Sequence, residues 1–336
     1  MNYIGSKLKL CDFIVPHITS AVQKPLSECV LCDLFAGTGA VGRAFKGKVK
    51  SIIANDKEFY SFVLNQHYIG NNATFANLDS LIKRLDNLQG IKGKIYSHYS
   101  LGGTQGKAFE RLYFSDENAM KIDSIRAEIG NLKRNKAIDL GAYYFLLTSL
   151  LECADKVANV ASVYGAFLKR LKKSALKSME FRGAKSEIGN NANEVYNCDA
   201  NELIRHIKGD ILYLDPPYNA REYGANYHLL NTIALYDDFA PQGKTGLREY
   251  EKSAWCKKGC VADELECLIK YADFEWICLS YNDEGILGLD EIERIFKSQG
   301  TYKRVSTNYQ RFKADSNRTA KQQSTIEYLH ILRKNG

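Results

Sequence analysis

The stretch that decides the fold is CVLCDLFAGTGAVGRAFKGKVKSIIAND, residues 29–56. It contains two apolar runs, at 29–35 and 51–54, separated by a glycine turn and a helix-like segment at 37–46. Apolar runs joined through a helix are typical of a β-α-β unit, whose parallel strands are buried on both faces. The stretch therefore predicts an α/β fold, with helices on both faces of a doubly wound sheet.

The same pattern extends toward the C-terminus but is interrupted in the middle of the chain. Apolar runs predict further strands at 194–197, 210–215, 276–281 and 325–332, and helices are expected at 6–19, 201–207 and 289–298. From about residue 91, Gly-rich loops lead instead into helical patterns at 116–136 and 139–159. We therefore expect one α/β domain, formed by 1–90 and 193–336, and an inserted, mainly helical domain at 91–192.

Composition limits the class of protein. Hydrophobic residues make up 45% of the 336 residues, which is enough for a packed core, and the net charge of +7 favours a polyanionic partner. We find no secretory leader and no apolar run long enough to span a membrane, so a cytoplasmic protein is expected. The CxxC at Cys29 and Cys32 lies in a predicted strand, and Cys256 and Cys260 have no nearby histidine pair, so no metal is predicted.

Three acidic positions follow predicted strands. Asp33 precedes the glycine turn, and it would suit an ammonium group better than a pyrophosphate, although Gly37-x-Gly39-x-x-Gly42 also fits a dinucleotide fingerprint. Asp56 ends the next strand, where a carboxylate can accept ribose hydroxyls, and Asp199 follows the strand at 194–197. A methyl donor, a nucleotide and a plain tight turn all remain open for the glycine turn by itself.

The most informative motif is Asp215-Pro216-Pro217-Tyr218, which follows the apolar run at 211–214. The carboxylate and the Pro216 carbonyl would accept hydrogen bonds from an aromatic amine, and neither proline has an N–H to donate. Tyr218 could stack on a base that has left the duplex. The alternative is a strand followed by an ordinary Pro-Pro turn.

In its motif order the chain resembles the Dam-like, alpha-group N6-adenine DNA methyltransferases of type II restriction–modification systems. The resemblance rests on residues 3–7, 33–39, 55–56, 199 and 215–218. It implies a Rossmann-like sheet that binds S-adenosylmethionine, with S-adenosylhomocysteine as product, and it implies that Tyr3, Lys7, Asp56 and Asp215 contact the methyl donor. The predicted catalytic residues are Asp215, Pro216, Pro217 and Tyr218, and the predicted cofactor residues are Tyr3, Lys7, Asp33, Phe35, Gly37, Gly39, Asp56, Asp199 and Asp215.

Basic segments predict where DNA would bind. The stretch 164–185 carries seven Lys or Arg against one acid, and 302–322 repeats this pattern with interleaved aromatics. The segment 219–236 follows the reaction centre and would wall the base pocket. The predicted DNA-binding residues are Tyr164, Lys169, Arg170, Lys172, Lys173, Arg221, Tyr227, Arg311 and Lys313.

These observations predict a site-specific adenine methyltransferase that acts on double-stranded DNA by base flipping. The expected partners are DNA and a cognate restriction endonuclease acting separately, with no membrane, and the expected location is the cytoplasm, at the bacterial nucleoid. Three alternatives remain: a methyltransferase for RNA or a protein glutamine, which would usually carry Asn-Pro-Pro-Tyr; a nicotinamide oxidoreductase, which leaves the Pro-Pro-Tyr turn unexplained; and a DNA-binding subunit without activity.

Overall fold

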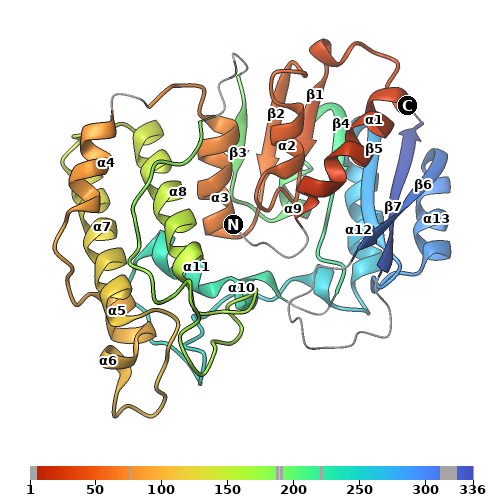
Figure 1. The fold of residues 1–336 in the computed structure, drawn as a ribbon. Helices are drawn as coiled ribbons and strands as arrows, with labels where there is room; N and C mark the ends of the chain where they lie inside the picture. The colour runs from red at the N-terminus through yellow and green to blue at the C-terminus, as the bar shows by residue number, and fades with distance from the viewer. Residues whose placement is uncertain are drawn as a thin grey trace. The chain divides into compact units, whose positions relative to one another are not determined.

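The computed structural model describes residues 6–75, 78–186, 189, 192–219, 222–310 and 324–335. The chain divides into two compact units (Figure 1). The first, which we call the sheet unit, consists of Gly5–Asn72, Gly189–Glu222 and Lys252–Gly336. The second, the helical unit, consists mainly of Ala73–Ile188 and Tyr223–Glu251.

Within the described residues, seven strands of the sheet unit form one sheet in the order β3-β2-β1-β4-β5-β7-β6. The strands are β1 (Val30–Asp33), β2 (Ser51–Asn55), β3 (Glu194–Tyr196), β4 (Lys208–Leu214), β5 (Asp273–Asn282), β6 (Gly300–Gln310) and β7 (Ser324–Lys334). The strands β1 to β5 are parallel, whereas β7 runs antiparallel to both β5 and β6. The β-α-β unit predicted from residues 29–56 is present.

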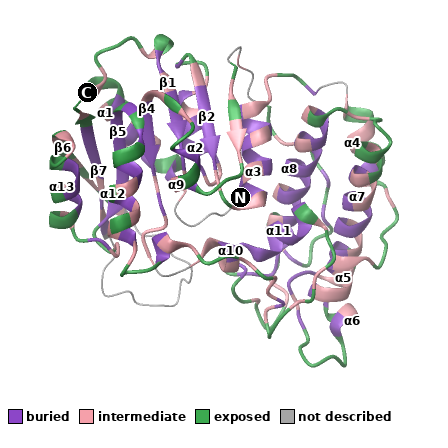
Figure 2. Cartoon of the chain, turned by 180° about the vertical axis from the view of Figure 1, so that it is seen from behind, coloured by how far each residue is buried: buried purple, intermediate pink, exposed green. Residues whose placement is uncertain are grey.

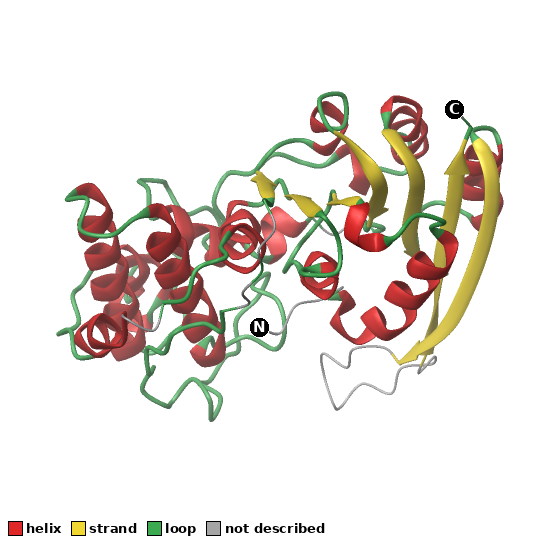
Figure 3. Cartoon of the chain, turned by 90° about the horizontal axis from the view of Figure 1, so that it is seen from above, coloured by secondary structure: helices red, strands yellow, loops and turns green. Residues whose placement is uncertain are grey.

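Helices cover both faces of this sheet, as expected for a Rossmann-like methyltransferase fold (Figure 3). One apolar core lies between the sheet and α1 (Cys11–Ala21) and α2 (Ala40–Phe45), and the other lies between the sheet and α9 (Ala200–Leu203), α12 (Val261–Tyr271) and α13 (Leu289–Lys297). Alternate residues of β4 enter opposite cores: Ile211 and Tyr213 enter the first, and Leu212 and Leu214 the second. The central strands are accordingly buried along most of their length (Figure 2).

The remaining elements of the sheet unit are short. They are α3 (Phe59–Asn65), η1 (Lys7–Leu10), η2 (Leu26–Glu28), η3 (Gln66–Gly70) and η5 (Ala254–Cys256). The strand β6 was not predicted, because its sequence reads as a basic segment. It is an edge strand, and charged side chains are common on an edge because they discourage pairing with another chain.

The described part of the helical unit contains helices and no strand longer than an isolated bridge. Its helices are α4 (Asp79–Asp86), α5 (Lys94–Tyr99), α6 (Leu101–Thr104), α7 (Asp116–Arg134), α8 (Leu140–Val157), α10 (Tyr223–Asn226) and α11 (His228–Leu235). Serine and aspartate caps begin the two long helices: Ser115 Oγ accepts from the Asn118 amide, and Asp139 Oδ1 accepts from the Ala142 amide. Within the described residues, no helix is both long and apolar enough to span a membrane.

The helical unit is larger than the predicted insertion at 91–192. It begins at Ala73 and it also takes in Tyr223–Glu251. The later segment belongs to this unit because the buried Arg126 guanidinium donates hydrogen bonds to the carbonyls of Ile233 and Ala234 at the end of α11 (2.8 and 2.9 Å). A cation at a helix C-terminus is favoured by the helix dipole as well as by these bonds.

Candidate active site

The predicted site residues of the sheet unit gather where the sheet changes winding direction. From β1 the chain runs outward through β2 and β3, and it then returns to β4 on the other side of β1. Ligands of open α/β sheets bind beyond the carboxyl ends of the strands at such a switch point. Asp33 lies opposite both Ala54 and Tyr213 in the sheet, so Asp56 and Asp215, each two residues further along, emerge at this same edge.

The glycine turn after β1 adopts a backbone that only glycine readily supports. Gly37 and Gly39 have φ values of 53° and 73°, in the left-handed region. A Cβ atom at Gly39 would lie 2.5 Å from Asn65 Oδ1. The Gly37 carbonyl accepts hydrogen bonds from the side chains of Ser61 and Asn65 of α3, which fix the turn from below. These hydrogen bonds fix the conformation of the turn at the carboxyl end of β1.

Asp33 is almost completely buried, at 1% exposure, beneath this turn. Its Oδ2 accepts a hydrogen bond from the Gly42 amide in α2 (3.0 Å). Burial raises the pKa of Asp33 to about 7; the Gly42 amide opposes this rise, and the charges of Asp215 and Asp56 add to it. Asp33 therefore ties the start of α2 to the end of β1. The adjacent Phe35 is half-buried, and its ring packs edge-on against Trp255 (5.0 Å between centroids).

Asp56 holds the glycine turn from the β2 side. Its two carboxylate oxygens accept hydrogen bonds from the amides of Gly37 and Glu58, each at 2.8 Å. Burial raises the pKa of Asp56, although these amides and Ser61 counteract the effect. Each carboxylate oxygen has two lone pairs, so the group keeps capacity for hydroxyl donors.

Asp199 follows β3 and caps α9. Its Oδ1 accepts from the Asn201 amide (2.9 Å), and its Oδ2 lies 3.6 Å from Lys57 Nζ. Both partners of this ion pair are exposed, so the pair adds little stability. Asp199 thus combines a capping role with an accessible carboxylate at the carboxyl edge.

The motif Asp215–Tyr218 leaves the end of β4 directly into the site. Asp215 is 16% exposed, and its Oδ1 lies 2.9 Å from the ammonium of Lys7, which is itself only 4% exposed. The Lys7 ammonium occupies this buried oxygen through a charge-assisted contact, so the other carboxylate oxygen, Oδ2, to which no described residue donates, is the one left for an incoming amine. Burial raises the pKa of Asp215 to about 6, Lys7 opposes the rise, and Glu327 adds to it.

The Tyr218 ring stands beside the same cluster. Lys7 Nζ lies 5.5 Å from the ring centroid, and the Tyr281 ring meets Tyr218 edge-on at 6.0 Å. The Tyr218 carbonyl accepts from the Ile286 amide (2.9 Å), which fixes the turn after Pro217. Burial raises the pKa of the Tyr218 hydroxyl. Pro216 is buried, and Pro217 and Tyr218 are half-buried.

Sequence reasoning missed several residues that position this site. Asn55 is buried at the end of β2, where its side chain bonds the Leu34 carbonyl and both the amide and carbonyl of Cys198, so one amide side chain ties together the ends of three strands. Its place directly before Asp56 was the only signal available. Asn65 and Glu327 gave no sequence signal, because their relevance depends on α3 and β7 reaching the carboxyl edge.

The helical unit holds several of the predicted DNA-binding residues. Lys169, Arg170 and Lys173 are exposed, in a segment without regular structure. Lys172 is half-buried, and its ammonium donates to the Val160 carbonyl (2.7 Å), so its charge is used within the unit. We leave Lys172 out of the proposed DNA surface for this reason.

Tyr164 and Tyr227 have a different place from the one predicted. Both side chains are fully buried, and their rings meet edge-on at 6.3 Å. The Tyr164 hydroxyl donates to Asp155 Oδ1 (2.8 Å), and its carbonyl accepts from the Tyr113 hydroxyl (2.6 Å). In this structure they are core residues, and we do not carry them into the proposed DNA surface. The predicted residues Tyr3, Arg221, Arg311 and Lys313 lie outside the described residues.

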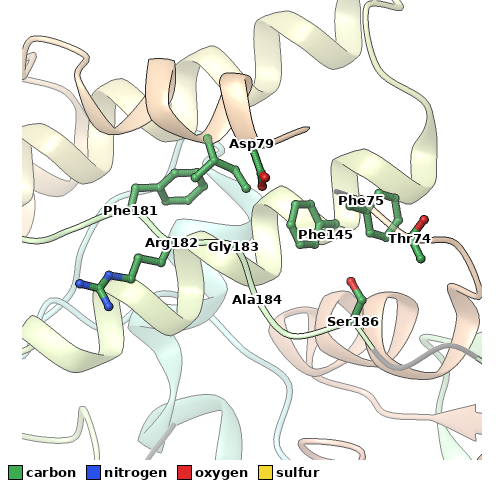
Figure 4. A pocket seen from close by; sticks show the side chains of 10 residues that line it. Thr74, Phe75, Asp79, Phe145, Phe181, Arg182, Gly183, Ala184 and Ser186 are labelled. Atoms are coloured by element: carbon green, nitrogen blue, oxygen red, sulfur yellow. The ribbon is translucent and has the colours of Figure 1, made fainter. Parts of the chain in front are cut away.

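A hollow of about 540 Å³ lies within the helical unit and contains none of the predicted site residues (Figure 4). Phe75 and Phe145, whose rings stack at 4.7 Å, line it together with Phe181. Thr74, Asp79 and Ser186 are among its polar lining. Among the described residues, no cluster of three or more His, Cys, Asp or Glu could hold a metal ion, and Cys29 and Cys32 are both buried free thiols of the sheet unit.

Comparisons with known proteins agree with the geometry. The sequence profile of the D12 class N6 adenine-specific DNA methyltransferase family matches residues 3–295. The chain is 57% identical to Type II methyltransferase M.NlaIII of Neisseria lactamica, over 99% of both chains. It is 40% identical to Type II methyltransferase M.FokI of Planomicrobium okeanokoites, over 99% of this chain and 53% of that protein, and 38% identical to Type II methyltransferase M.CviAII of Paramecium bursaria Chlorella virus 1, over 94% and 93%.

Proposed function

Because the chain belongs to the D12 class N6 adenine-specific DNA methyltransferase family, we propose that it is a site-specific DNA methyltransferase that modifies adenine N6 in double-stranded DNA. The observation that carries the proposal is the Asp215 carboxylate, which the end of β4 presents beside Pro216 with one oxygen held by Lys7 and the other without a donor among the described residues. The cofactor would be S-adenosylmethionine, and the product S-adenosylhomocysteine.

The residues at the switch point fit this cofactor. Without a Cβ, Gly39 lets the turn pack directly against Asn65, whose Oδ1 is buried there with no donor among the described residues. An ammonium group is a suitable donor for this oxygen. Asp56 keeps lone pairs for ribose hydroxyls, and Asp199 offers an accessible carboxylate to an adenine amine. Asp33 would act by holding Gly42 and the turn, since its carboxylate is buried beneath them.

The cofactor supplies an activated methyl group on a positively charged sulfur, so the chain's own residues must mainly prepare the amine. The N6 lone pair of adenine is delocalised into the ring, and hydrogen bonds from N6–H₂ to Asp215 and the Pro216 carbonyl would localise it on nitrogen. An ionised carboxylate is a stronger acceptor than a neutral acid, and Lys7 favours the ionised form of Asp215 by opposing the rise of its pKa. Tyr218 would stack on the base once it has left the duplex.

As N6 gains the methyl group its positive charge grows, and one of its protons must leave. The Asp215 carboxylate would stabilise that charge in a partly dehydrated site, where fixed charges act more strongly than in water. Lys7 has no acceptor function, because its ammonium stays protonated: burial alone would lower its pKa, but Asp215, Glu327 and Tyr218 raise it above the ordinary value.

The DNA surface of the proposal consists of exposed basic residues. Lys169, Arg170 and Lys173 of the helical unit would contact phosphates, which supply most of the non-specific affinity of such proteins. Arg221, Arg311 and Lys313 stay in the proposal from sequence alone. The helical unit would carry target recognition, because base-edge contacts need side chains beyond those that perform the chemistry.

The similarity to type II methyltransferases supports a role as the modification component of a restriction–modification system, with a cognate endonuclease acting separately. We propose the cytoplasm, at the nucleoid DNA, as its place of action. Sequencing with methylation detection, on DNA from cells that express the chain, tests reaction, base and target site together. N6-methyladenine at one recurrent sequence, absent with Asp215→Ala, is the expected result; the same methylation in that variant would refute the proposed chemistry.

A further inference from the structure

Glu327 is a buried carboxylate with no assigned role. It lies on β7 with 6% exposure, directly opposite Asn282 at the end of β5. Because Leu279 of β5 pairs with Leu214 of β4, this part of β7 reaches the same edge of the sheet as Asp215. A carboxylate with so little exposure is costly unless hydrogen bonds or an opposite charge compensate it, so a cation is expected nearby.

Lys7 provides part of that compensation. Its ammonium contacts Asp215 at 2.9 Å. The charge of Glu327 also raises the pKa of Lys7, although these two side chains are not close enough to form an ion pair. Tyr218 lies between these groups, since it interacts both with Lys7 and with Asn282, the partner of Glu327 across the strands. The buried cluster thus contains one cation and two carboxylates.

Lys7 and Asp215 alone would form a neutral pair. With Glu327 ionised, the cluster carries a net charge of about −1, because two carboxylates share one ammonium. This surplus also acts on Asp215, whose proton affinity Glu327 increases. Asp283, which follows the end of β5, is different in kind: it is exposed, and it accepts hydrogen bonds from the Thr325 hydroxyl and the Ile326 amide (3.2 Å) of β7.

We propose that Glu327 strengthens the negative charge with which the active site holds a cationic methyl donor. The inference rests on the proposed function. In the reaction the sulfur–carbon bond breaks as the nitrogen–carbon bond forms, so one positive charge moves from sulfur to N6, and it is lost when N6 releases a proton to solvent water. Until that proton leaves, the site holds one extra positive charge, which the negative charge of the cluster helps to balance.

This role makes a prediction that a packing role would not. S-adenosylmethionine carries the sulfonium charge, whereas S-adenosylhomocysteine has the same frame with a neutral thioether. Coulomb's law with an effective dielectric constant of about 20 gives a change of about tenfold or more in a binding constant for unit charges within about 10 Å of each other. Removing the Glu327 charge should therefore weaken the sulfonium ligand about tenfold and leave the thioether ligand within about twofold.

The test is calorimetric titration of both ligands into the full-length protein and into Glu327→Gln, which has nearly the same shape without the charge. Glu327→Asp restores the charge on a shorter side chain and should recover part of the preference for the cation. Glu275→Gln is the matched control. Glu275 lies near the N-terminal end of β5, away from the carboxyl edge; it is exposed and pairs with Arg333. It changes the net charge by the same amount and should leave both affinities unchanged.

Each outcome decides. A tenfold loss confined to S-adenosylmethionine, partly restored by Glu327→Asp, supports the inference. Equal losses for both ligands, or no loss for either, would overturn it, because the charge would then have no selective effect. If the unsubstituted protein binds neither ligand and forms no N6-methyladenine, the proposed function itself fails. Thermal unfolding of each variant at one pH shows whether a loss of binding reflects loss of the fold.

Discussion

Replacement of Lys7 by methionine should move the acidic limb of the pH–rate profile upward. Lys7 Nζ lies 2.9 Å from Asp215 Oδ1, with 4% and 16% exposure, so solvent screens the pair only partly. Coulomb's law at an effective dielectric constant of about 20 gives about 6 kcal/mol for this separation. Because desolvation and residual water offset most of that attraction, we expect the pKa of Asp215 to rise by one to two, from about 6 to roughly 7–8.

The direction in which the acidic limb moves depends on which protonation state of Asp215 is active. The carboxylate is the stronger hydrogen-bond acceptor for N6–H₂ and stabilises the positive charge that grows on nitrogen, whereas the protonated acid carries no charge, so activity falls as the pH drops through the pKa. In the unsubstituted protein kcat/KM should fall below about pH 6, whereas in Lys7→Met it should already be falling near neutral pH and approach its plateau only near pH 9. Lys9→Met, an exposed lysine in the same short helix, is the control and should leave the profile unchanged.

The assay is methyl transfer to a DNA duplex containing the target site, measured from pH 5 to 9 at saturating cofactor. An unshifted acidic limb in Lys7→Met, with only a lower plateau, would refute the electrostatic role of Lys7. Stability supplies a second reading. Since the pKa of Asp215 in the folded state lies above its ordinary value of 3.8, its ionisation lowers stability progressively as the pH rises from about 4 to about 6. Loss of Lys7 increases this cost, so Lys7→Met should be less stable than the parent at pH 8, and the difference should shrink at pH 5.

Three further outcomes are expected. Gly39→Ala should abolish most cofactor binding, because it adds a clash with Asn65 to a strained left-handed backbone that costs about 1–2 kcal/mol; Gly47→Ala, with φ of +77° and nothing within 4 Å, isolates the strain and should leave calorimetric affinity unchanged. Asp56→Ala should weaken S-adenosylmethionine binding with little effect on DNA affinity in a gel-shift titration; equal weakening of both would argue against a ribose contact. The third change neutralises the exposed basic residues Lys169, Arg170 and Lys173. It should reduce the slope of the logarithm of the DNA-binding constant against the logarithm of salt concentration by up to about 2.7, and an unchanged slope would remove these residues from the interface.

The sheet could be read from the sequence because burial on both faces leaves a simple mark. The strands β1, β2, β4 and β5 are continuous apolar runs, and the predicted bounds differ from the observed ones by a few residues. The strand β6 lies at the edge and is largely exposed, so its sequence carries no such run. An apolar run in the sequence indicates a buried strand. The strand β6 was not predicted because it is not buried and so has no such run.

The limits of the helical unit could not be read in the same way. Tyr223–Glu251 follows the reaction centre in sequence, and proximity along the chain placed it beside the base pocket. Its attachment depends on Arg126, which bonds the end of α11 from more than one hundred residues away. Tyr164 and Tyr227 looked like surface aromatics in basic or polar segments, but a buried Tyr is recognised only from the partner of its hydroxyl, such as Asp155.

The parts of the candidate site that could be predicted are those whose residues are neighbours in the sequence. The turn at Gly37–Gly39 and the motif at Asp215–Tyr218 are contiguous, whereas the charge balance of the centre is assembled from η1, β4 and β7. This division also separates two kinds of failure. On the cofactor side, Asp56 acts through neutral backbone amides, so its loss should cost affinity without changing the pH profile. On the side of the amine, Lys7 and Glu327 act by charge on one carboxylate, so their losses should shift the same acidic limb in opposite directions: upward without Lys7, and downward without Glu327.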